Sequence, residues 1–163
     1  MMLNTQKDKH IIIARVDNKP GVVSRMSGLF TRRGYNIESL VTGMTEDASV
    51  YNMTITVIGT EEEVRLLIHQ LEHIMEVIEV YTAAEKKCVT RELMFIKLWC
   101  GAEKRAEAMS IARSIRLNVA GVAPDRILFE VCGDEAALQS AAAAFDRLGR
   151  LEIVRSGALT VSL

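Results

Sequence analysis

The sequence predicts an α+β protein made of two βαββαβ halves in tandem. Some segments alternate apolar and polar residues with the two-residue period of strands, and others repeat apolar residues at the three- and four-residue spacing of helices. The order strand, helix, strand, strand, helix, strand occurs twice along the 163 residues. Hydrophobic residues make up 49% of the chain, which is enough for a packed core in each half.

The first half opens with an isoleucine-rich strand over residues 10–16, followed by turn-forming residues at 17–21. Pro20 suits the first turn of a helix, and the helix that follows is expected to end near Gly34. The apolar stripe that predicts this helix comprises Val22, Val23, Met26, Leu29 and Phe30.

Two strands come next, over residues 35–44 and 50–58, and a polar turn at 45–47 joins them. The second strand alternates, so one of its faces belongs to the core and the other is expected to be exposed to solvent. The core face carries Tyr51, Met53, Ile55 and Val57, and the solvent face carries Asn52, Thr54 and Thr56.

Thr60 and Glu63 form a capping-box pattern that opens a second helix, and residues 77–82 supply a fourth strand. This order is typical of the ferredoxin-like arrangement, in which two helices cover one face of a four-stranded antiparallel sheet. We expect the first domain to span residues 1–83 and a charged linker to span residues 84–91.

The second half repeats this order, and we expect it to form a second ferredoxin-like domain over residues 92–163. Asp134 is the expected cap of its second helix, whose apolar stripe extends to Leu148. Its other predicted elements are strands at 93–100, 117–123 and 126–132, a helix at 103–116, and one or two strands within 151–161.

Charge and composition argue against nucleic-acid and membrane partners. A net charge of −1 and a sequence pI near 6.3 provide no field that attracts phosphate backbones or anionic lipid. The polar segment Met1–His10 lacks the apolar core of a signal peptide, so we expect a cytoplasmic protein. Cys88, Cys100 and Cys132 are odd in number and widely spaced, which favours buried free thiols.

The sequence shows no set of residues typical of an active site. It contains no obvious pairing of a nucleophile with a base, no paired carboxylates and no metal cluster. His69 and His73 would share a helix face, but a third ligand at predictable spacing is lacking, which favours a solvated helix face. We therefore expect no catalytic residue, no metal and no cofactor in this chain.

One constellation predicts a binding site for an amino acid. It combines the junction Asp17-Asn18-Lys19-Pro20-Gly21 with the segment Gly34-Tyr35-Asn36-Ile37. A helix N-terminus has unpaired backbone N–H groups and partial positive charge, which suit a carboxylate. Gly21 and Val22 would provide these amides, and glycine permits close approach of a ligand. The asparagine side chains both donate and accept hydrogen bonds, which suits a zwitterion, and Val22 and Ile37 would border a dry slot.

The same residues also have a purely structural interpretation. Asn18 would cap the first helix, Pro20 would start it, and Asn36 would fill a turn. Capping and turn formation are the commonest uses of these residue types, so the residues alone favour this simpler interpretation.

Two stretches of this region resemble the N-terminal ACT domain of acetohydroxyacid synthase (acetolactate synthase) small regulatory subunits. They are DNKPGVVSR at residues 17–25 and LFTRRGYNIESL at residues 29–40. The run RRGYNIESL is more specific than the proline–glycine turn that ACT domains share. The resemblance continues at residues 53–55, 89–94 and 155–157, so it covers most of the chain.

The resemblance implies a regulatory subunit rather than an enzyme. Such subunits form a homodimer through their ACT domains and bind a branched-chain amino acid at the interface. They control a large catalytic subunit that carries thiamine diphosphate, FAD and magnesium. We expect valine as the effector, and we expect the C-terminal domain to interact with a partner. The residues carried over are Asn18 and Gly21 in the effector loop, Asn36 reaching from the partner protomer, and Val22 and Ile37 beside them.

One departure and two rival functions accompany this resemblance. Relatives often carry serine–arginine where this chain has Tyr51-Asn52, so a basic group is expected to be missing from the open face of the first sheet. A stand-alone ACT-type amino-acid sensor is the nearer rival. An RNA-recognition module shares the βαββαβ order, but an aromatic content of 5% and the lack of stacking rings on that face argue against it.

Overall fold

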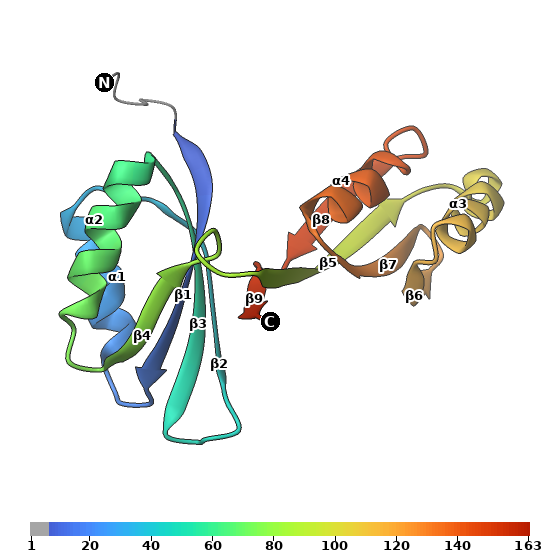
Figure 1. Cartoon of the computed structure of the whole chain (residues 1–163). Helices are drawn as coiled ribbons and strands as arrows, with labels where there is room; N and C mark the ends of the chain where they lie inside the picture. The colour runs from blue at the N-terminus through green and yellow to red at the C-terminus, as the bar shows by residue number, and fades with distance from the viewer. Residues whose placement is uncertain (1–6) are drawn as a thin grey trace. The chain divides into compact units, whose positions relative to one another are not determined.

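The computed structural model describes residues 7–163, so residues 1–6 of the predicted first domain and N-terminal segment lie outside the described part. The βαββαβ order occurs twice, which confirms the α+β class with two ferredoxin-like halves (Figure 1). The first half contains β1 (Asp8–Asp17), α1 (Val22–Arg32), β2 (Ile37–Met44), β3 (Val50–Gly59), α2 (Glu61–Glu72) and β4 (Val77–Thr82). The remaining elements are β5 (Cys88–Trp99), α3 (Ala102–Ser114), β6 (Asn118–Ala123), β7 (Arg126–Gly133), α4 (Glu135–Ala143), β8 (Arg150–Arg155) and β9 (Leu159–Ser162).

The chain divides into two compact units. The first unit extends to Val89 and also includes Ala158–Leu163, and the second spans Thr90–Gly157. β9 therefore belongs to the first unit, where the Leu163 N–H donates to the Lys87 carbonyl at 2.9 Å. Whether residues 1–83 and 92–163 fold as independent domains stays a prediction.

The first unit has a sheet with strand order β2–β3–β1–β4, all antiparallel, and α1 and α2 cover one of its faces (Figure 1). The alternation of β1 explains this arrangement, because every second side chain faces the helices. The core between sheet and helices includes Ile12, Ala14 and Val16 of β1, Met26 and Phe30 of α1, and Leu67 and Leu71 of α2.

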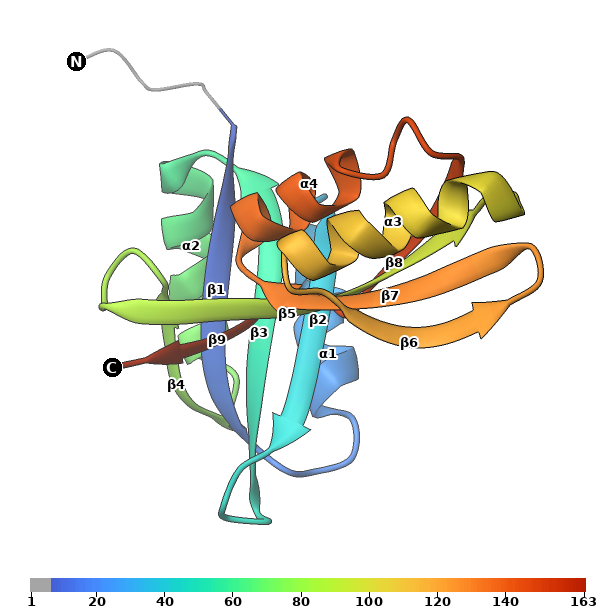
Figure 2. The same ribbon diagram turned by 90° about the vertical axis from the view of Figure 1, so that its right-hand side faces the viewer.

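The second unit has the strand order β6–β7–β5–β8, with α3 and α4 on one face (Figure 2). Phe129 of β7 stacks on Phe145 with ring centroids 4.6 Å apart, and both side chains are completely buried. α4 ends at Ala143, earlier than its apolar stripe predicts, because Phe145 and Leu148 enter the core from the turns that follow. A helical spacing of apolar residues therefore continued past the end of the helix.

Predictions about exposure were wrong at several positions. Thr54 and Thr56 are only 2% and 1% exposed, although the alternation of β3 placed them on a solvent face. Thr54 Oγ1 accepts a hydrogen bond from the Thr160 N–H of β9, so the last strand covers part of this face. Among the cysteines, Cys100 is buried as predicted, whereas Cys132 is exposed and Cys88 is intermediate. Within residues 7–163, no helix has the length and apolarity to cross a membrane.

Candidate functional site at the start of the first helix

Asn18 follows the end of β1 and is fixed to the hairpin between β2 and β3. Its backbone N–H donates to the Ser49 carbonyl at 2.7 Å, and its side-chain amide donates to the Ala48 carbonyl at 2.9 Å. The residue nevertheless stays exposed. Because α1 has no side-chain cap, the structural interpretation in which Asn18 caps this helix is wrong.

The N-terminus of α1 is open. Gly21 occupies the N-cap position with a φ of 87°, a left-handed conformation that glycine adopts without strain. The Val22 N–H has a long contact of 3.4 Å to the Lys19 carbonyl. Within residues 7–163, the N–H groups of Gly21, Val23 and Ser24 have no hydrogen-bond acceptor, and the first turn of α1 has no acidic residue. This end of the helix therefore presents unpaired donors and partial positive charge.

Asn18, Gly21 and Val22 form a corner at the start of α1, and carboxylates of the same unit neutralise the cations near it. Lys19 pairs with Asp17 at 2.6 Å, and this hydrogen bond raises the pKa of the Lys19 ammonium. The Arg25 guanidinium lies beside Gly21 and pairs with Glu76 at 2.5 Å. The uncompensated positive charge at the corner is consequently that of the helix end itself.

The structure does not bring all five predicted residues together in one chain. Ile37 of β2 aligns with Val57 of β3, and Val57 aligns with His10 of β1. Asn36 and Ile37 therefore lie near the first residues of β1. Asn18 lies beyond the other end of β1. Seven residues of strand separate His10 from Asp17, which corresponds to about 23 Å.

Their side chains also differ in what they offer a ligand. The Asn36 side chain is exposed, and Ile37 packs against the core. The Val22 side chain is 3% exposed, so only its backbone is available to a ligand. Asn18, Gly21 and Val22 therefore share one corner, and Asn36 and Ile37 share another.

The structure adds one charged residue that the sequence patterns did not single out. Arg15 lies directly opposite Asn52 in the β1–β3 register, on the sheet face away from the helices. The face where Asn52 replaces an expected arginine therefore still carries a guanidinium, from the neighbouring strand. Strand alignment was the signal needed to find it, and the alternation of β3 alone did not contain that signal.

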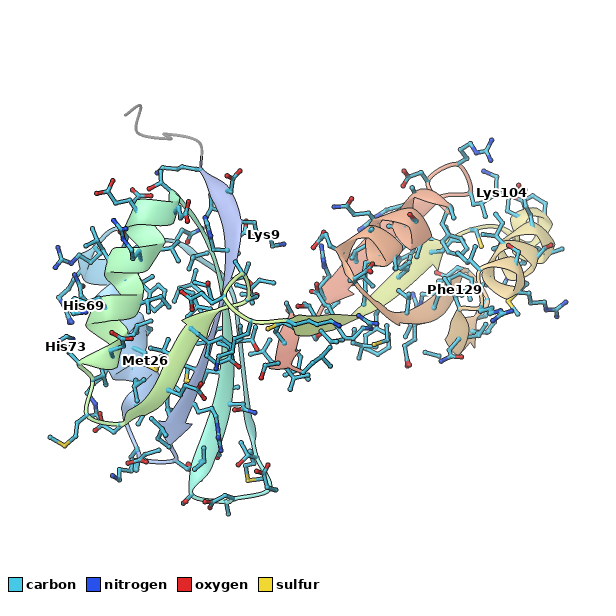
Figure 3. The ribbon with its side chains drawn as sticks, viewed as in Figure 1. Lys9, Met26, His69, His73, Lys104 and Phe129 are labelled. Carbon is cyan, nitrogen blue, oxygen red and sulfur yellow. The ribbon has the colours of Figure 1, made fainter. Side chains whose placement is uncertain are left out.

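The two histidines of α2 form no metal site with other residues. His69 and His73 project from the helix away from the sheet (Figure 3), and their rings meet edge to face with centroids 4.6 Å apart. His73 Nδ1 lies 2.6 Å from the His69 carbonyl oxygen. Across the described part of the chain, no group of three or more His, Cys, Asp or Glu side chains is arranged to hold a metal ion.

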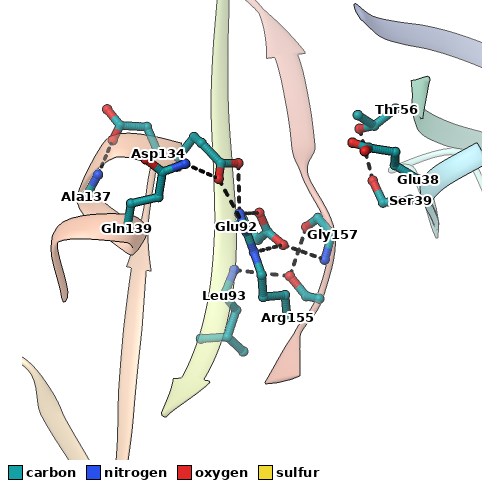
Figure 4. Close-up of polar contacts among 12 residues, drawn as sticks. Glu38, Ser39, Thr56, Glu92, Leu93, Asp134, Ala137, Gln139, Arg155 and Gly157 are labelled. Atoms are coloured by element: carbon teal, nitrogen blue, oxygen red, sulfur yellow. Dashed lines mark hydrogen bonds and ion pairs between the residues drawn. The ribbon is translucent and has the colours of Figure 1, made fainter. Parts of the chain in front are cut away.

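A polar network in the second unit fixes the end of β8 (Figure 4). Arg155 donates two hydrogen bonds to Glu92, at 3.0 and 2.6 Å, and two to Glu135, at 3.2 and 2.9 Å. The Gly157 N–H also donates to Glu92, at 3.0 Å. These contacts use four of the five N–H donors of the guanidinium and raise its pKa, so its function is structural.

Comparison with known proteins identifies both halves. Residues 12–79 match the family model for the AHAS small subunit-like ACT domain, and residues 91–162 match the model for the small subunit of acetolactate synthase. The probable acetolactate synthase small subunit of Archaeoglobus fulgidus is 39% identical over 149 residues, covering 91% of this chain and 93% of that protein. Its counterpart in Methanothermobacter thermautotrophicus is 33% identical over 162 residues, covering 99% and 96%.

A solved structure agrees with this assignment. The crystal structure of the acetolactate synthase small subunit from Thermotoga maritima superimposes with a TM-score of 0.81 at 25% identity, covering 96% of this chain and 98% of that one. Similarity therefore extends over both halves rather than over the ACT domain alone. The chain belongs to the family of acetolactate synthase small subunits, which are the regulatory and not the catalytic subunits of that enzyme.

Proposed function

We propose that this chain works as a homodimer that binds valine and thereby controls a thiamine-dependent catalytic subunit in branched-chain amino-acid biosynthesis. The observation that carries this proposal is the open N-terminus of α1 beside an anchored asparagine. The family assignment supports the regulatory role. The effector, the dimer and its control of the catalyst are the proposed parts.

The corner provides complementary groups for each end of an amino acid. The free N–H groups of Gly21, Val23 and Ser24 would receive the carboxylate. The Asn18 side chain already donates its amide hydrogen to Ala48, which orients its Oδ1 as an acceptor for the ammonium group. Val23 is 39% exposed and offers apolar surface for an aliphatic side chain.

The position of Asn36 supports a site shared between two protomers. β2 lies at the edge of its sheet, so a second copy can pair with it antiparallel about a two-fold axis. If that axis passes through the middle of β2, between Leu40 and Val41, Asn36 lies opposite Thr45 of the partner subunit. Thr45 begins the turn whose carbonyls hold Asn18. One pairing would therefore carry each Asn36 to the other protomer's corner and create two equivalent sites.

An effector bound in this way contacts both protomers and so favours one arrangement of the dimer. The catalytic subunit would respond to that change, because the free energy of coupling acts reciprocally between the two sites. Thiamine diphosphate, FAD and magnesium would belong to the catalytic subunit. This chain would hold none of them and would act in the cytoplasm.

Isothermal titration calorimetry with valine, leucine and isoleucine tests effector binding. We expect valine to bind with one site per protomer and Asn36→Ala to weaken binding by at least about tenfold, because charge-assisted hydrogen bonds of this kind contribute roughly 1.5–3 kcal/mol. Melting temperature should not change, since Asn36 is exposed. Asn118→Ala is the matched control, because it removes an exposed asparagine from the second unit. Absence of heat with all three amino acids well above millimolar concentration would refute the proposal.

A heterodimer of two defective variants tests whether the site is shared. One protomer carries Asn18→Ala and the other carries Asn36→Ala, with different affinity tags for purification. A shared arrangement leaves one corner with both asparagines intact, so one valine should bind per dimer with wild-type affinity. If each site lay within a single protomer, both sites would be defective and no binding would return.

The catalytic partner requires its own experiment, which also separates this proposal from a stand-alone sensor. The tagged chain is used to capture proteins from the native lysate. We expect a larger thiamine-dependent protein to co-purify and its activity to respond to valine only when this chain is present. Valine binding without any such partner would favour the stand-alone sensor.

A further inference from the structure

An open pocket of about 180 Å³ lies in the first unit, on the sheet face opposite α1 and α2. β1, β3, β4 and the β2–β3 turn form its floor and side, and β9 forms one wall. Its charged side chains are Arg15, Glu46 and Glu79, and β9 contributes Thr160, Val161 and Ser162. The pocket shares no residue with the corner at Asn18 and Gly21.

Two opposite charges in this pocket have no ion-pair partner. Glu79 pairs with Lys86 at 2.5 Å, so its charge is compensated. Within residues 7–163, Arg15 and Glu46 form no ion pair or side-chain hydrogen bond, with each other or with another residue. The Asp47 carboxylate accepts hydrogen bonds from the Ser49 hydroxyl and N–H, which lower its pKa. The charge of Arg15 contributes further to lowering the pKa of Asp47, but within the described chain no ion pair forms between the two side chains.

The lining selects among ligand classes. A phosphate would match Arg15 but would be repelled by the uncompensated carboxylate of Glu46. A simple cation would match the carboxylates but leave the half-buried guanidinium unpaired. A ligand with one positive and one negative group compensates both charges. At roughly 30 Å³ per water molecule, the volume corresponds to about six waters, which is the size of a small polar metabolite.

We propose that this pocket binds a small polar α-amino acid, with its carboxylate on Arg15 and its ammonium group on Glu46. This would be a second ligand site, separate from the corner at the start of α1. The carboxylate–guanidinium pairing would be the stronger contact, because arginine presents a planar pair of donors to a carboxylate. Glu46 is exposed, so its contribution would be smaller.

The ligand would also act on the attachment of β9. β9 is held to the first unit by bonds that include Thr160 N–H to Thr54 Oγ1 and Leu163 N–H to the Lys87 carbonyl. A ligand that contacts Arg15 on β1 and the β9 wall at once would oppose detachment of this strand. Amide hydrogen exchange at residues 160–163 should therefore slow when the ligand is present.

NMR titration of the isotope-labelled full chain with L-serine tests the proposal. We expect saturable shifts of the amides of Arg15 and of residues 160–162, with binding weakened at least about tenfold by Arg15→Gln. Lys9→Gln is the matched control, because it removes the same charge from the same strand outside the pocket. We expect a dissociation constant in the millimolar range. The absence of shifts at a serine concentration about 50-fold above that range, or shifts that persist unchanged in Arg15→Gln, would overturn the proposal.

L-Glycerate tests the ammonium contact, because it keeps the carboxylate and the hydroxymethyl group of serine and replaces only the amine with a hydroxyl. We expect glycerate to bind several-fold more weakly than serine, and Glu46→Gln to weaken serine without affecting glycerate. Equal binding of both probes would overturn the zwitterion assignment. The valine response should survive in Arg15→Gln and the serine response should survive in Asn36→Ala, so failure of one site is distinguishable from failure of the other.

Discussion

The first helix of each half begins at a glycine without a side-chain cap, yet the two helix starts differ in what surrounds them. α1 has no acidic residue in its first turn, and the N–H groups of Gly21, Val23 and Ser24 have no acceptor within the described chain. In α3 the carboxylate of Glu103 folds over Gly101 and takes the space that a Cβ would occupy there. The second half therefore supplies its own carboxylate, and the first half leaves the position open to an external one.

The second helices of the two halves do not show this difference. Thr60 and Glu63 form a complete capping box on α2, and Asp134 accepts a hydrogen bond from the Ala137 N–H at the start of α4. Side-chain capping is thus present where no ligand is proposed. The contrast teaches that the missing cap on α1 is local to the proposed effector corner and is not a general property of this chain.

Substitutions of core phenylalanines should have the largest effects, and they test whether the two halves unfold as separate units. Phe129→Ala should destabilise the second unit by about 3–5 kcal/mol, and Phe30→Ala should do the same to the first. Urea unfolding followed by circular dichroism and by valine binding would measure both. We expect Phe129→Ala to separate an early transition without loss of valine binding, and Phe30→Ala to abolish binding. Simultaneous loss of both signals in each variant would show that the halves unfold as one unit.

Arg155→Met should have the next largest effect, because it leaves Glu92 and Glu135 without their shared partner. Hydrogen bonds to charged groups contribute roughly 1.5–3 kcal/mol, and we expect a loss of free energy of unfolding in this range. Arg150→Met is the control on the same strand, since Arg150 forms no ion pair within residues 7–163. Equal urea midpoints for the two variants would contradict a structural role for the network.

Val23→Glu would give α1 the carboxylate that α3 already has, because Val23 occupies the second position of α1, as Glu103 does in α3. The introduced carboxylate should compete with the effector and weaken valine binding by about tenfold, while stabilising the helix by roughly 0.3–1 kcal/mol. Val23→Gln controls for side-chain size. If calorimetry gives the same affinity for both variants, the open helix end is not where the effector carboxylate binds.

The smallest effect concerns the hairpin that holds Asn18. Hydrogen bonds from Ser49 lower the pKa of the Asp47 carboxyl below its ordinary value of 3.8. A depressed pKa in the folded state means that this interaction stabilises the hairpin at pH values above 3.8 and is lost as the pH falls through the folded pKa. NMR titration of Asp47 should give a midpoint below 3.8, and Ser49→Ala should raise it. An unchanged midpoint in Ser49→Ala would contradict this cause.

The sequence predicted what depends on neighbouring residues. Periodicity located the helices and strands of both βαββαβ halves but did not separate β8 from β9, and Thr60 with Glu63 located the capping box, because these signals span only a few positions. The same kind of local pattern pointed to the helix start at Gly21, and carboxylate binding there stays a prediction. The residues themselves also placed Asn36 in this site, and the family resemblance added the expected dimer, in which Asn36 reaches from the partner protomer.

What the sequence missed depends on contacts between distant segments. The simpler interpretation of Asn18 was a helix cap, but its side chain bonds to a residue 30 positions away. Thr54 was expected to face solvent, but a residue 106 positions later covers it. The position of Arg15 opposite Asn52 follows only from the pairing of β1 with β3. Propensity and period carry no information about such pairings.

The return of β9 to the first unit makes the second unit an insertion in the first, from Thr90 to Gly157. Two peptide connections therefore join the units, where a simple tandem would have one. Ending the chain at Gly157 would leave the second unit complete but would remove β9 from the first unit. Replacing residues 90–157 by a short loop would instead keep the first unit continuous, which makes it the better starting point for isolating the unit that carries both proposed sites.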